Sequence, residues 1–398
     1  MIHNQIMKQA HLLYICSKEE PSIVKALSSR YSVHLHYVGM DKEWENLFWD
    51  VVIFQDADAW QTCFFQKLKK FPWLFLSTRR DIRGYVSPKA NLFGVINMGG
   101  ADLSLWGIPQ ELQLRLQPPA EKKGNYYYFE PQPETCRIVY CPTGNSVYEN
   151  DFKLLSFLQL TNAALTIVSD QYQALADSFP YVRIVPRKSW LPAFKKAHLV
   201  VASGHDAICA MALCKPCIVL GDCGLGGMVT PANYEQLQSV SFSGRKGASV
   251  GEMVPPDLLE AEFFKVLGFD YKEDMQILQK EVWQSYGWRN FSTLLFKEID
   301  RVMNMSVAMS SKEKRLALKP FLSSVFRQEI FEGKRYMMRG MLCIGELDEE
   351  MVGLLEQCDG TTSIRELMKK NGYDSKVASI LWGNLYELWK EKLILFKL

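Results

Sequence analysis

The sequence predicts an α/β protein with two Rossmann-like, doubly wound domains followed by a small winged-helix domain. Short apolar runs alternate with helix-compatible stretches over most of the 398 residues, which is typical of parallel sheets covered by helices. This alternation stops once and then starts again, so we expect two domains of similar construction. The C-terminal segment shows a different pattern, with a ribbon of short strands followed by helical stretches.

The first domain is placed at residues 1–116. Helix-compatible segments lie at 19–29 and 60–70. The apolar runs that we interpret as strands are HLLYICS, VHLHYVG, DVVIFQDA, WLFLSTR and FGVINMGG. Residues 117–134 hold four prolines and three consecutive tyrosines, which indicates an interdomain linker.

The second domain is placed at residues 135–305. Its expected strands are CRIVYCPTGNS, ALTIVSD, VRIVP, HLVVASG and CIVLG, and a helix is expected at 151–160. Residues 271–305 have a helical pattern with a break at Gly287, and they close the domain. The polar and basic stretch at 306–318 is interpreted as a second linker.

The third domain is placed at residues 319–398. It begins with a ribbon of strands that turns at Gly333 and Gly340. Helical patterns follow at 348–357, 363–370 and 374–392, and the chain ends in the apolar strand LILF. A small ribbon combined with three helices is the plan of a winged helix.

Composition is that of an ordinary globular protein, with 48% hydrophobic and 23% charged residues. The net charge of +2 gives no global field that would attract nucleic acid or an anionic membrane. The C-terminal domain holds twelve basic and twelve acidic residues, which argues against DNA binding. Ten cysteines are too sparse for a secreted disulfide scaffold, and no run reaches the length of a membrane span. We therefore expect a cytoplasmic protein whose partners include neither nucleic acid nor a membrane.

Residues 198–237 read as a strand, a Ser-Gly turn, a helix, a strand and a glycine-rich loop. This order brings a helix N-terminus to one edge of a parallel sheet, where free N–H groups and the helix dipole favour an anion. In this interpretation Ser203 and the N–H groups of Gly204 and His205 hold a diphosphate, and His205 can donate to it. The alternative is a capping box formed by Ser203 and Asp206.

Three glycines follow the next strand at Gly224, Gly226 and Gly227. Such residues allow a ligand to approach the backbone closely. Their position after a strand in the same domain as Ser203 favours ligand contact, and an ordinary turn is the alternative.

Cys209, Cys214 and Cys217 have a spacing seen in plant-type iron–sulfur ligation, and the last two form a Cys-x-x-Cys pair. The pair lies at the C-terminus of the expected helix, where the dipole opposes a thiolate. We therefore interpret these cysteines as small buried apolar residues and expect no metal.

The expected helix and the Lys-Pro after it contain Ala207, Ala210, Met211, Ala212, Lys215 and Pro216, and the next loop reads GLGGMVTPANYE. This pattern resembles the nucleotide-sugar-binding half of GT-B glycosyltransferases. The resemblance implies GT-B architecture and a nucleotide sugar as co-substrate, with no separate cofactor. It also implies that the turn at Gly144 and Asn145 faces the donor phosphates, for which an ordinary turn is the alternative. Glu235 would replace the ribose-contacting acid, since Cys209 stands at that acid's position.

The C-terminal domain carries a second pattern at Leu347, Leu354, Leu355, Cys358, Asp359, Gly360, Ser363, Ile364 and Leu367. This pattern resembles the PqqD-like domain, which is also called the recognition element of ribosomally synthesised peptide (RiPP) pathways. The resemblance implies a winged helix that binds the leader of a precursor peptide as an added strand, in a groove between residues 341–347 and 377–388. The implied peptide-binding residues are Met341, Cys343, Gly345, Leu381 and Leu385.

These features together predict a peptide-modifying, glycosyltransferase-like protein of a RiPP maturation pathway. The expected reaction transfers a sugar from a nucleotide to the peptide, and N–H groups around Ser203 stabilise the departing diphosphate. No residue is assigned as a catalytic base. The alternative is a catalytically inactive GT-B-like adaptor that delivers the precursor to a separate modifying enzyme, and it is favoured by the replacement of the acid by Cys209.

Overall fold

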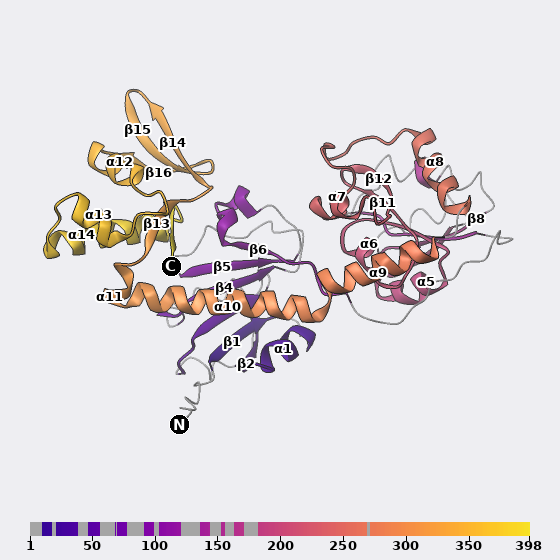
Figure 1. Cartoon of the computed structure of the whole chain (residues 1–398), viewed down its shortest axis with the longest axis horizontal. Coiled ribbons are helices and arrows are strands. Elements are labelled where there is room, and N and C mark those ends of the chain that lie inside the picture. Colours follow the sequence, from indigo (N-terminus) through magenta and orange to yellow (C-terminus); the bar gives the residue numbers. More distant parts are fainter. Residues whose placement is uncertain are drawn as a thin grey trace. The chain divides into compact units, whose positions relative to one another are not determined.

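The computed structural model describes residues 10–17, 21–38, 47–55, 68, 70–77, 91–98, 103–120, 136–143, 153–155, 163–170, 182–268 and 271–398 (Figure 1). The chain divides into two compact units. Met1–Gln117 and Ser292–Leu398 form the first unit, and Pro118–Phe291 forms the second. Residues 292–305, which the sequence assigned to the second domain, therefore group with the first unit.

The first unit contains a six-stranded parallel sheet. In spatial order its strands are β2 (Ser32–Tyr37), β1 (His11–Cys16), β3 (Val51–Gln55), β4 (Trp73–Ser77), β5 (Leu92–Asn97) and β6 (Gln113–Arg115). The first five confirm the strands expected from apolar runs, and β6 was not expected. Strands β1, β3, β4 and β5 are buried on both faces, which explains why each reads as a continuous apolar run.

Helices cover this sheet as far as the described residues extend. Helix α1 (Pro21–Ser28) confirms the first expected helix, whereas most of the second, at 60–70, lies outside the described residues. From Ser292 onward, helix α10 (Trp288–Ser310) packs on the sheet (Figure 1). Its Arg301 donates to the carbonyl oxygen of Phe93 in β5 at 2.7 Å.

The expected linker at 306–318 is wrong. Helix α10 continues to Ser310, and the short helix α11 (Lys312–Arg315) follows it. The helix extends because Ala308 and Met309 are buried, so the apolar face does not end where the polar sequence begins. Ser311 then caps α11 by accepting the N–H of Lys314 at 3.3 Å.

The second unit contains another six-stranded sheet, in which β11 and β12 are antiparallel and the other pairs are parallel. In spatial order its strands are β12 (Gly224–Met228), β11 (Cys217–Gly221), β10 (Leu199–Ala202), β7 (Cys136–Tyr140), β8 (Ala163–Val168) and β9 (Val182–Val185). The five strands expected from apolar runs are confirmed. The expected glycine-rich loop is wrong, because its glycines form β12.

Five α-helices of the second unit lie within the described residues. They are α5 (Trp190–Lys196), α6 (Gly204–Ala212), α7 (Tyr234–Ser239), α8 (Pro256–Gly268) and α9 (Lys272–Tyr286). The expected break between α9 and α10 at Gly287 is confirmed. The helix expected at 151–160 is described only at 153–155, and the expected linker at 117–134 only as far as Ala120, whose N–H donates to the carbonyl oxygen of Tyr286 at 2.7 Å.

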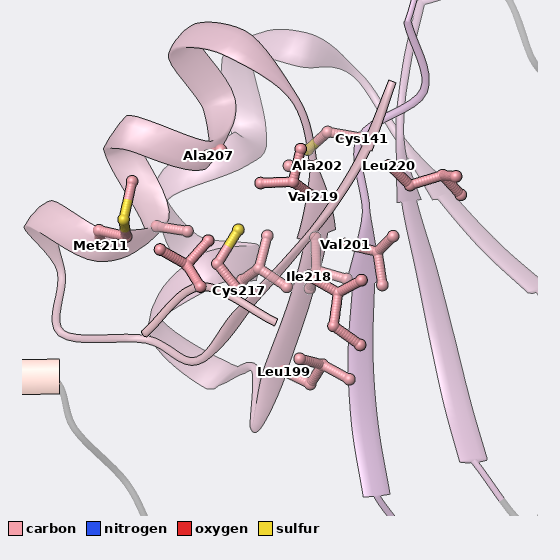
Figure 2. Close-up of a cluster of buried hydrophobic side chains, with 14 of the residues drawn as sticks. Cys141, Leu199, Val201, Ala202, Ala207, Met211, Cys217, Ile218, Val219 and Leu220 are labelled. Atoms are coloured by element: carbon pink, nitrogen blue, oxygen red, sulfur yellow. The ribbon is translucent and has the colours of Figure 1, made fainter. Parts of the chain in front are cut away.

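The core of the second unit forms between α6 and the sheet. Figure 2 shows Ala207 and Met211 of α6 in one apolar cluster with Val201, Cys217 and Ile218 of the adjacent strands. These side chains are fully buried. The packing fixes α6 against the sheet, and with it the position of the helix N-terminus.

The C-terminal segment of the first unit contains the expected ribbon and helices. Strands β14 (Phe326–Phe331), β15 (Lys334–Arg339) and β16 (Leu342–Leu347) form an antiparallel sheet. Helices α12 (Glu349–Glu356), α13 (Ile364–Lys370) and α14 (Ser375–Lys390) follow. The last strand, β17 (Ile394–Lys397), pairs with β13 (Lys319–Leu322), a pairing that the sequence did not predict. In the described part of the chain, no helix is long and apolar enough to cross a membrane.

Candidate functional site

The sheet of the second unit changes its direction of winding between β7 and β10. Strands β8 and β9 lie on one side of β7, whereas β10 and β11 lie on the other. In open α/β sheets, ligands bind beyond the carboxyl ends of the strands at such a switch point. Thr143 lies just beyond β7, and Ser203 and Gly204 lie just beyond β10. The sequence-predicted anion residues on α6 are therefore at the topological switch point.

The start of α6 differs from the expected capping box. Ser203 occupies the N-cap position with extended backbone, but within the described chain its hydroxyl accepts no N–H of the first helical turn. The expected capping box with Asp206 is therefore wrong. Gly204 has φ +54°, a left-handed conformation that suits glycine, and its N–H donates to the carbonyl oxygen of Phe242 at 2.9 Å. The protein itself thus satisfies one of the N–H groups that we expected to bind a diphosphate.

Asp206, in the first turn of α6, forms an ion pair with Arg187. Arg187 Nη1 lies 2.5 Å from Asp206 Oδ2, and the two side chains are 44% and 24% exposed. Arg187 follows β9, where its backbone N–H donates to the Asp170 carboxylate at 2.9 Å. Since β7 and β8 lie between β9 and β10, the arginine side chain reaches across the carboxyl ends of two strands. Sequence reasoning missed this residue, although it stands directly after the strand sequence VRIVP.

His205 adds a buried nitrogen to the same place. Its Nε2 lies 3.3 Å from Cys209 Sγ, and its Nδ1 is buried without a hydrogen-bond partner among the described residues. Burial lowers the pKa of His205, and the opposing effect of Asp206 does not offset this. The imidazole is therefore neutral at pH 7 and can donate or accept a single hydrogen bond through Nδ1, depending on its tautomer.

The glycines of β12 accommodate the protein's own chain. A Cβ on Gly226 would lie 2.8 Å from Leu237 Cδ2 and 2.9 Å from the carbonyl oxygen of Gly244. A Cβ on Gly227 would lie 3.0 Å from a carboxylate oxygen of Glu262, whose Oε2 accepts the N–H of the next residue at 2.7 Å. Packing thus explains the glycine at position 226, and at position 227 the left-handed φ of +82° is a further reason for glycine. Gly224 has φ +74° and begins the strand.

A short segment covers the carboxyl end of β11. The N–H of Cys223 donates to the carbonyl oxygen of Ser243 at 2.9 Å, and Arg245 returns a bond to the Cys223 carbonyl oxygen at 3.0 Å. A Cβ on Gly221 would lie within 3 Å of both Ser243 and Ser203. Residues 243–245 therefore fill the space at the carboxyl end of β11. A ligand at the switch point would contact the groups near the end of β7 instead.

No described contact places the other predicted donor-site residues at the β7–β10 switch point. Glu235 lies exposed on α7. Gly144 and Asn145 lie outside the described residues, so their expected role stays a prediction.

Lys215, from the Lys-Pro sequence, has a structural role. Its side chain is fully buried, and Nζ donates to the carbonyl oxygens of Lys195 at 3.0 Å and Ala197 at 2.9 Å, at the end of α5. Burial, together with the charge of Arg137, lowers the pKa of Lys215 to about 8. A donor at this position satisfies carbonyl groups that the helix leaves open.

The three cysteines of the predicted iron–sulfur spacing are buried thiols. Cys209, Cys214 and Cys217 have 7%, 0% and 0% of their surface exposed. Burial raises the pKa of Cys214 to about 11, which keeps it a neutral thiol. Their interpretation as small buried side chains is confirmed, and Figure 2 shows Cys217 within the apolar cluster. Among the described residues, no three or more His, Cys, Asp and Glu side chains are grouped as a metal site would require.

The predicted peptide residues fall into two sets. Met341 is 93% exposed in the turn before β16, Cys343 is exposed on β16, and Gly345 on the same strand is half-buried. Leu381 and Leu385 on α14 are 5% and 0% exposed and belong to the core, so their side chains are not surface groups. Within the described part of the chain, β16 pairs with β15 alone, which leaves its outer edge unpaired.

No family model and no curated protein matches the chain. Among solved structures, it is similar to a glycosyltransferase from Rickettsia africae, with 11% identity and a TM-score of 0.47 over 74% of this chain and 99% of that one. It is also similar to a lipopolysaccharide outer core galactosyltransferase, with 12% identity and a TM-score of 0.47 over 74% and 99%. A protein from Anabaena, solved with UDP and glucose, has 11% identity and a TM-score of 0.45 over 73% and 100%. The strand orders of the two sheets define the fold of the chain.

Proposed function

We propose that this chain is a GT-B-like glycosyltransferase that binds a nucleotide sugar at the switch point of its second sheet and modifies a ribosomally made peptide. The observation that carries the proposal is the placement of Ser203, His205 and Arg187 at the β7–β10 switch point. A cationic guanidinium, a neutral imidazole and a helix N-terminus are groups that recognise a diphosphate.

The proposed reaction breaks the bond between the anomeric carbon of the sugar and the diphosphate oxygen. A bond forms from that carbon to a nucleophilic side chain of the peptide, whose proton is released, and the nucleoside diphosphate leaves. Arg187 and the first turn of α6 would stabilise the charge that develops on the leaving oxygen. No described residue is assigned as the base that takes the proton.

The peptide would bind along β16. The ribbon has two outer strands, β14 and β16. β14 carries the exposed residues Arg327 and Glu329, and charges of this kind protect a sheet edge from further pairing. β16 has the uncharged residues Leu342, Cys343 and Gly345, and the carboxylate of its acid, Glu346, is paired with Lys334 at 3.0 Å. An added strand is therefore favoured at β16, where main-chain bonds would supply affinity.

The C-terminal segment is fixed to the first sheet, so a bound peptide would be held in a defined position within the first unit. The rings of Phe93 in β5 and Trp389 in α14 lie 4.9 Å apart. Ser324 lies just before β14. Its hydroxyl accepts the N–H of Gln110, and its N–H and hydroxyl both donate to the carboxylate of Glu111. Such contacts distinguish a docked segment from a flexibly tethered one.

The nucleotide part is tested by a thermal-shift screen of the full chain with UDP, GDP, ADP and dTDP, with the matching nucleosides as controls. We expect one diphosphate to raise the unfolding temperature while its nucleoside does not, because recognition depends on the phosphates. If no diphosphate stabilises the protein at millimolar concentration, the transferase proposal is wrong.

The peptide part is tested by selecting a phage-displayed random peptide library against the full chain. We expect the selected peptides to lose binding to the variant Cys343→Lys, which places a charge on the β16 edge. The matched variant Gln328→Lys places the same charge on exposed β14 and should bind as the parent does. Equal loss in both variants, or in neither, would contradict docking at β16.

An inactive adaptor is the second candidate, and three contacts favour it. The N–H of Gly204 is bonded to the Phe242 carbonyl oxygen, the Asp206 carboxylate lies at the start of α6, and Glu262 covers the backbone of β12. Each places a protein oxygen where a phosphate oxygen would otherwise bind. An adaptor would bind selected peptides at β16 but show no stabilisation by any diphosphate.

A further inference from the structure

We infer that Asp206 is a resident counter-ion for Arg187, and that an incoming diphosphate binds by displacing this carboxylate from the guanidinium. The inference rests on the proposed nucleotide-sugar site and adds to it a residue that limits affinity. It concerns two side chains that sequence reasoning did not assign to ligand binding.

The geometry places the ion pair over the switch point. Asp206 belongs to the first turn of α6, a helix of nine residues, and its carboxylate holds Arg187 at 2.5 Å. Arg187 follows β9, the edge strand that pairs with β8. The fully buried thiol of Cys141, just after β7, has a pKa raised by burial first and then by Asp206, while Arg187 lowers it. Both charges therefore lie beside the carboxyl end of β7.

His205 supplies an independent indication that a ligand belongs here. Its Nδ1 is buried and has no hydrogen-bond partner within the described ranges. A buried polar atom without a partner is unfavourable, and a ligand oxygen or hydroxyl would satisfy it. This nitrogen is on the residue that precedes Asp206, in the same first turn of α6 as the ion pair.

The charge balance explains why the carboxylate must move. Arg187 contributes one positive charge, and the Asp206 carboxylate neutralises it. The carboxylate occupies the hydrogen-bonding position on the guanidinium that a phosphate oxygen would need. The Asp170 carboxylate, which accepts the backbone N–H of Arg187, adds a second negative charge nearby. Among the described residues, an anion that enters without displacing Asp206 would meet the Asp206 and Asp170 carboxylates beside the Arg187 guanidinium. Exchange of partners moves the Asp206 carboxylate away from the phosphate and gives the guanidinium a charge-assisted hydrogen bond to a phosphate oxygen.

A purely structural role for Asp206 makes a different prediction. An acid in the first turn of a helix stabilises the helix through its dipole. In that case the loss of its charge would lower thermal stability and leave ligand affinity unchanged or weaker. In the exchange account, the loss of the charge strengthens binding.

The test is calorimetric titration of the full chain with inorganic pyrophosphate and with UDP, at 50 mM salt, for the parent and three variants. We expect Asp206→Asn to bind about fivefold more tightly than the parent, the factor that corresponds to one partly exposed ion pair. Arg187→Gln should bind about tenfold more weakly, the factor that corresponds to a charge-assisted hydrogen bond. Lys188→Gln removes a charge from the exposed neighbouring residue and should match the parent within about twofold.

The possible results distinguish the counter-ion role of Asp206 from the nucleotide site on which it depends. If the parent binds UDP and Asp206→Asn binds equally or more weakly while remaining folded by thermal unfolding, the counter-ion role is wrong and the nucleotide site stands. If no form of the protein, including Asp206→Asn, binds either probe, both the counter-ion role and the nucleotide site are wrong. Equal weakening by Lys188→Gln and Arg187→Gln would indicate a diffuse charge effect and would also contradict the inference.

Discussion

The carboxylate of Glu111 accepts two hydrogen bonds from Ser324, one from the backbone N–H at 2.9 Å and one from the hydroxyl at 2.7 Å. The hydroxyl of Ser324 in turn accepts the N–H of Gln110 at 2.9 Å. These bonds join the N-terminal and C-terminal segments of the first unit, which are far apart in sequence. They indicate that the segment from Lys319 onward is docked on its neighbour.

We therefore expect Glu111→Ala to weaken this docking by about 1 kcal/mol, because it removes a charged acceptor from two donors. Hydrogen–deuterium exchange should show faster exchange at the start of β14 in the variant. Glu329→Ala changes an exposed acid on the same strand and serves as the control. Unchanged exchange in Glu111→Ala would show that the apolar contacts hold the segment without these bonds.

A second prediction concerns the contact between α10 and the first sheet. A Cβ on Gly94 in β5 would overlap the carboxylate of Glu298 and lie 2.8 Å from Arg301 Nη2. We expect Gly94→Ala to lower the free energy of unfolding by about 1–3 kcal/mol, through overpacking. Urea unfolding measures this effect.

The matched control for this prediction is Gly353→Ala in α12. A Cβ there meets nothing within 4 Å, so alanine should raise the free energy of unfolding by about 0.5–1 kcal/mol through its higher helix propensity. A loss at Gly353 as large as that at Gly94 would mean that the packing of α10 is not the cause.

The central strands of the two sheets could be predicted from the sequence because they are buried on both faces; they are β1, β3, β4 and β5 of the first sheet and β10 and β11 of the second. Burial on both faces requires apolar residues at consecutive positions. Strands such as β1 and β4 can therefore be recognised in the sequence as continuous apolar runs. β12 was missed because glycines have low strand propensity, and only its pairing with β11 makes it a strand. The extension of α10 past residue 305 was missed because buried Ala308 and Met309 lie within a polar sequence.

The candidate site was predicted in part. Ser203, Gly204 and His205 could be placed at a sheet edge because the order of a strand, a turn and a helix is local in sequence. The Arg187–Asp206 pair could not be found in this way, because it depends on the spatial order of β9, β8, β7 and β10. The β14–β16 ribbon was predicted from the glycines at its two turns. The structure agrees, because Gly333 and Gly340 have φ of +79° and +59°, a conformation that favours glycine.

A third prediction uses the buried ammonium of Lys215. Its pKa is about 8 in the folded protein, against an ordinary value of 10.5. Between these values the unfolded chain binds more protons at this residue, so its contribution to stability increases as pH rises from 8 to 10.5. The increase should be roughly 2 kcal/mol by pH 10.

The change is Lys215→Met, which keeps the apolar stem and removes the titrating group. Other groups, such as the buried cysteines, also titrate in this range, so the measured quantity is the difference between the parent and the variant in urea unfolding at pH 7 to 10. We expect the parent's advantage to grow with pH. A constant or shrinking difference would contradict the assignment of a buried, depressed lysine.

The central claim is that a nucleotide sugar binds at the β7–β10 switch point, and photolabelling with 5-azido-UDP-glucose tests it most directly. Labelling of the full chain should saturate, be prevented by excess UDP, and map to peptides within residues 182–212, which include Arg187, Ser203 and His205. Saturable labelling confined to the first unit, or labelling that excess UDP does not prevent, would contradict the account.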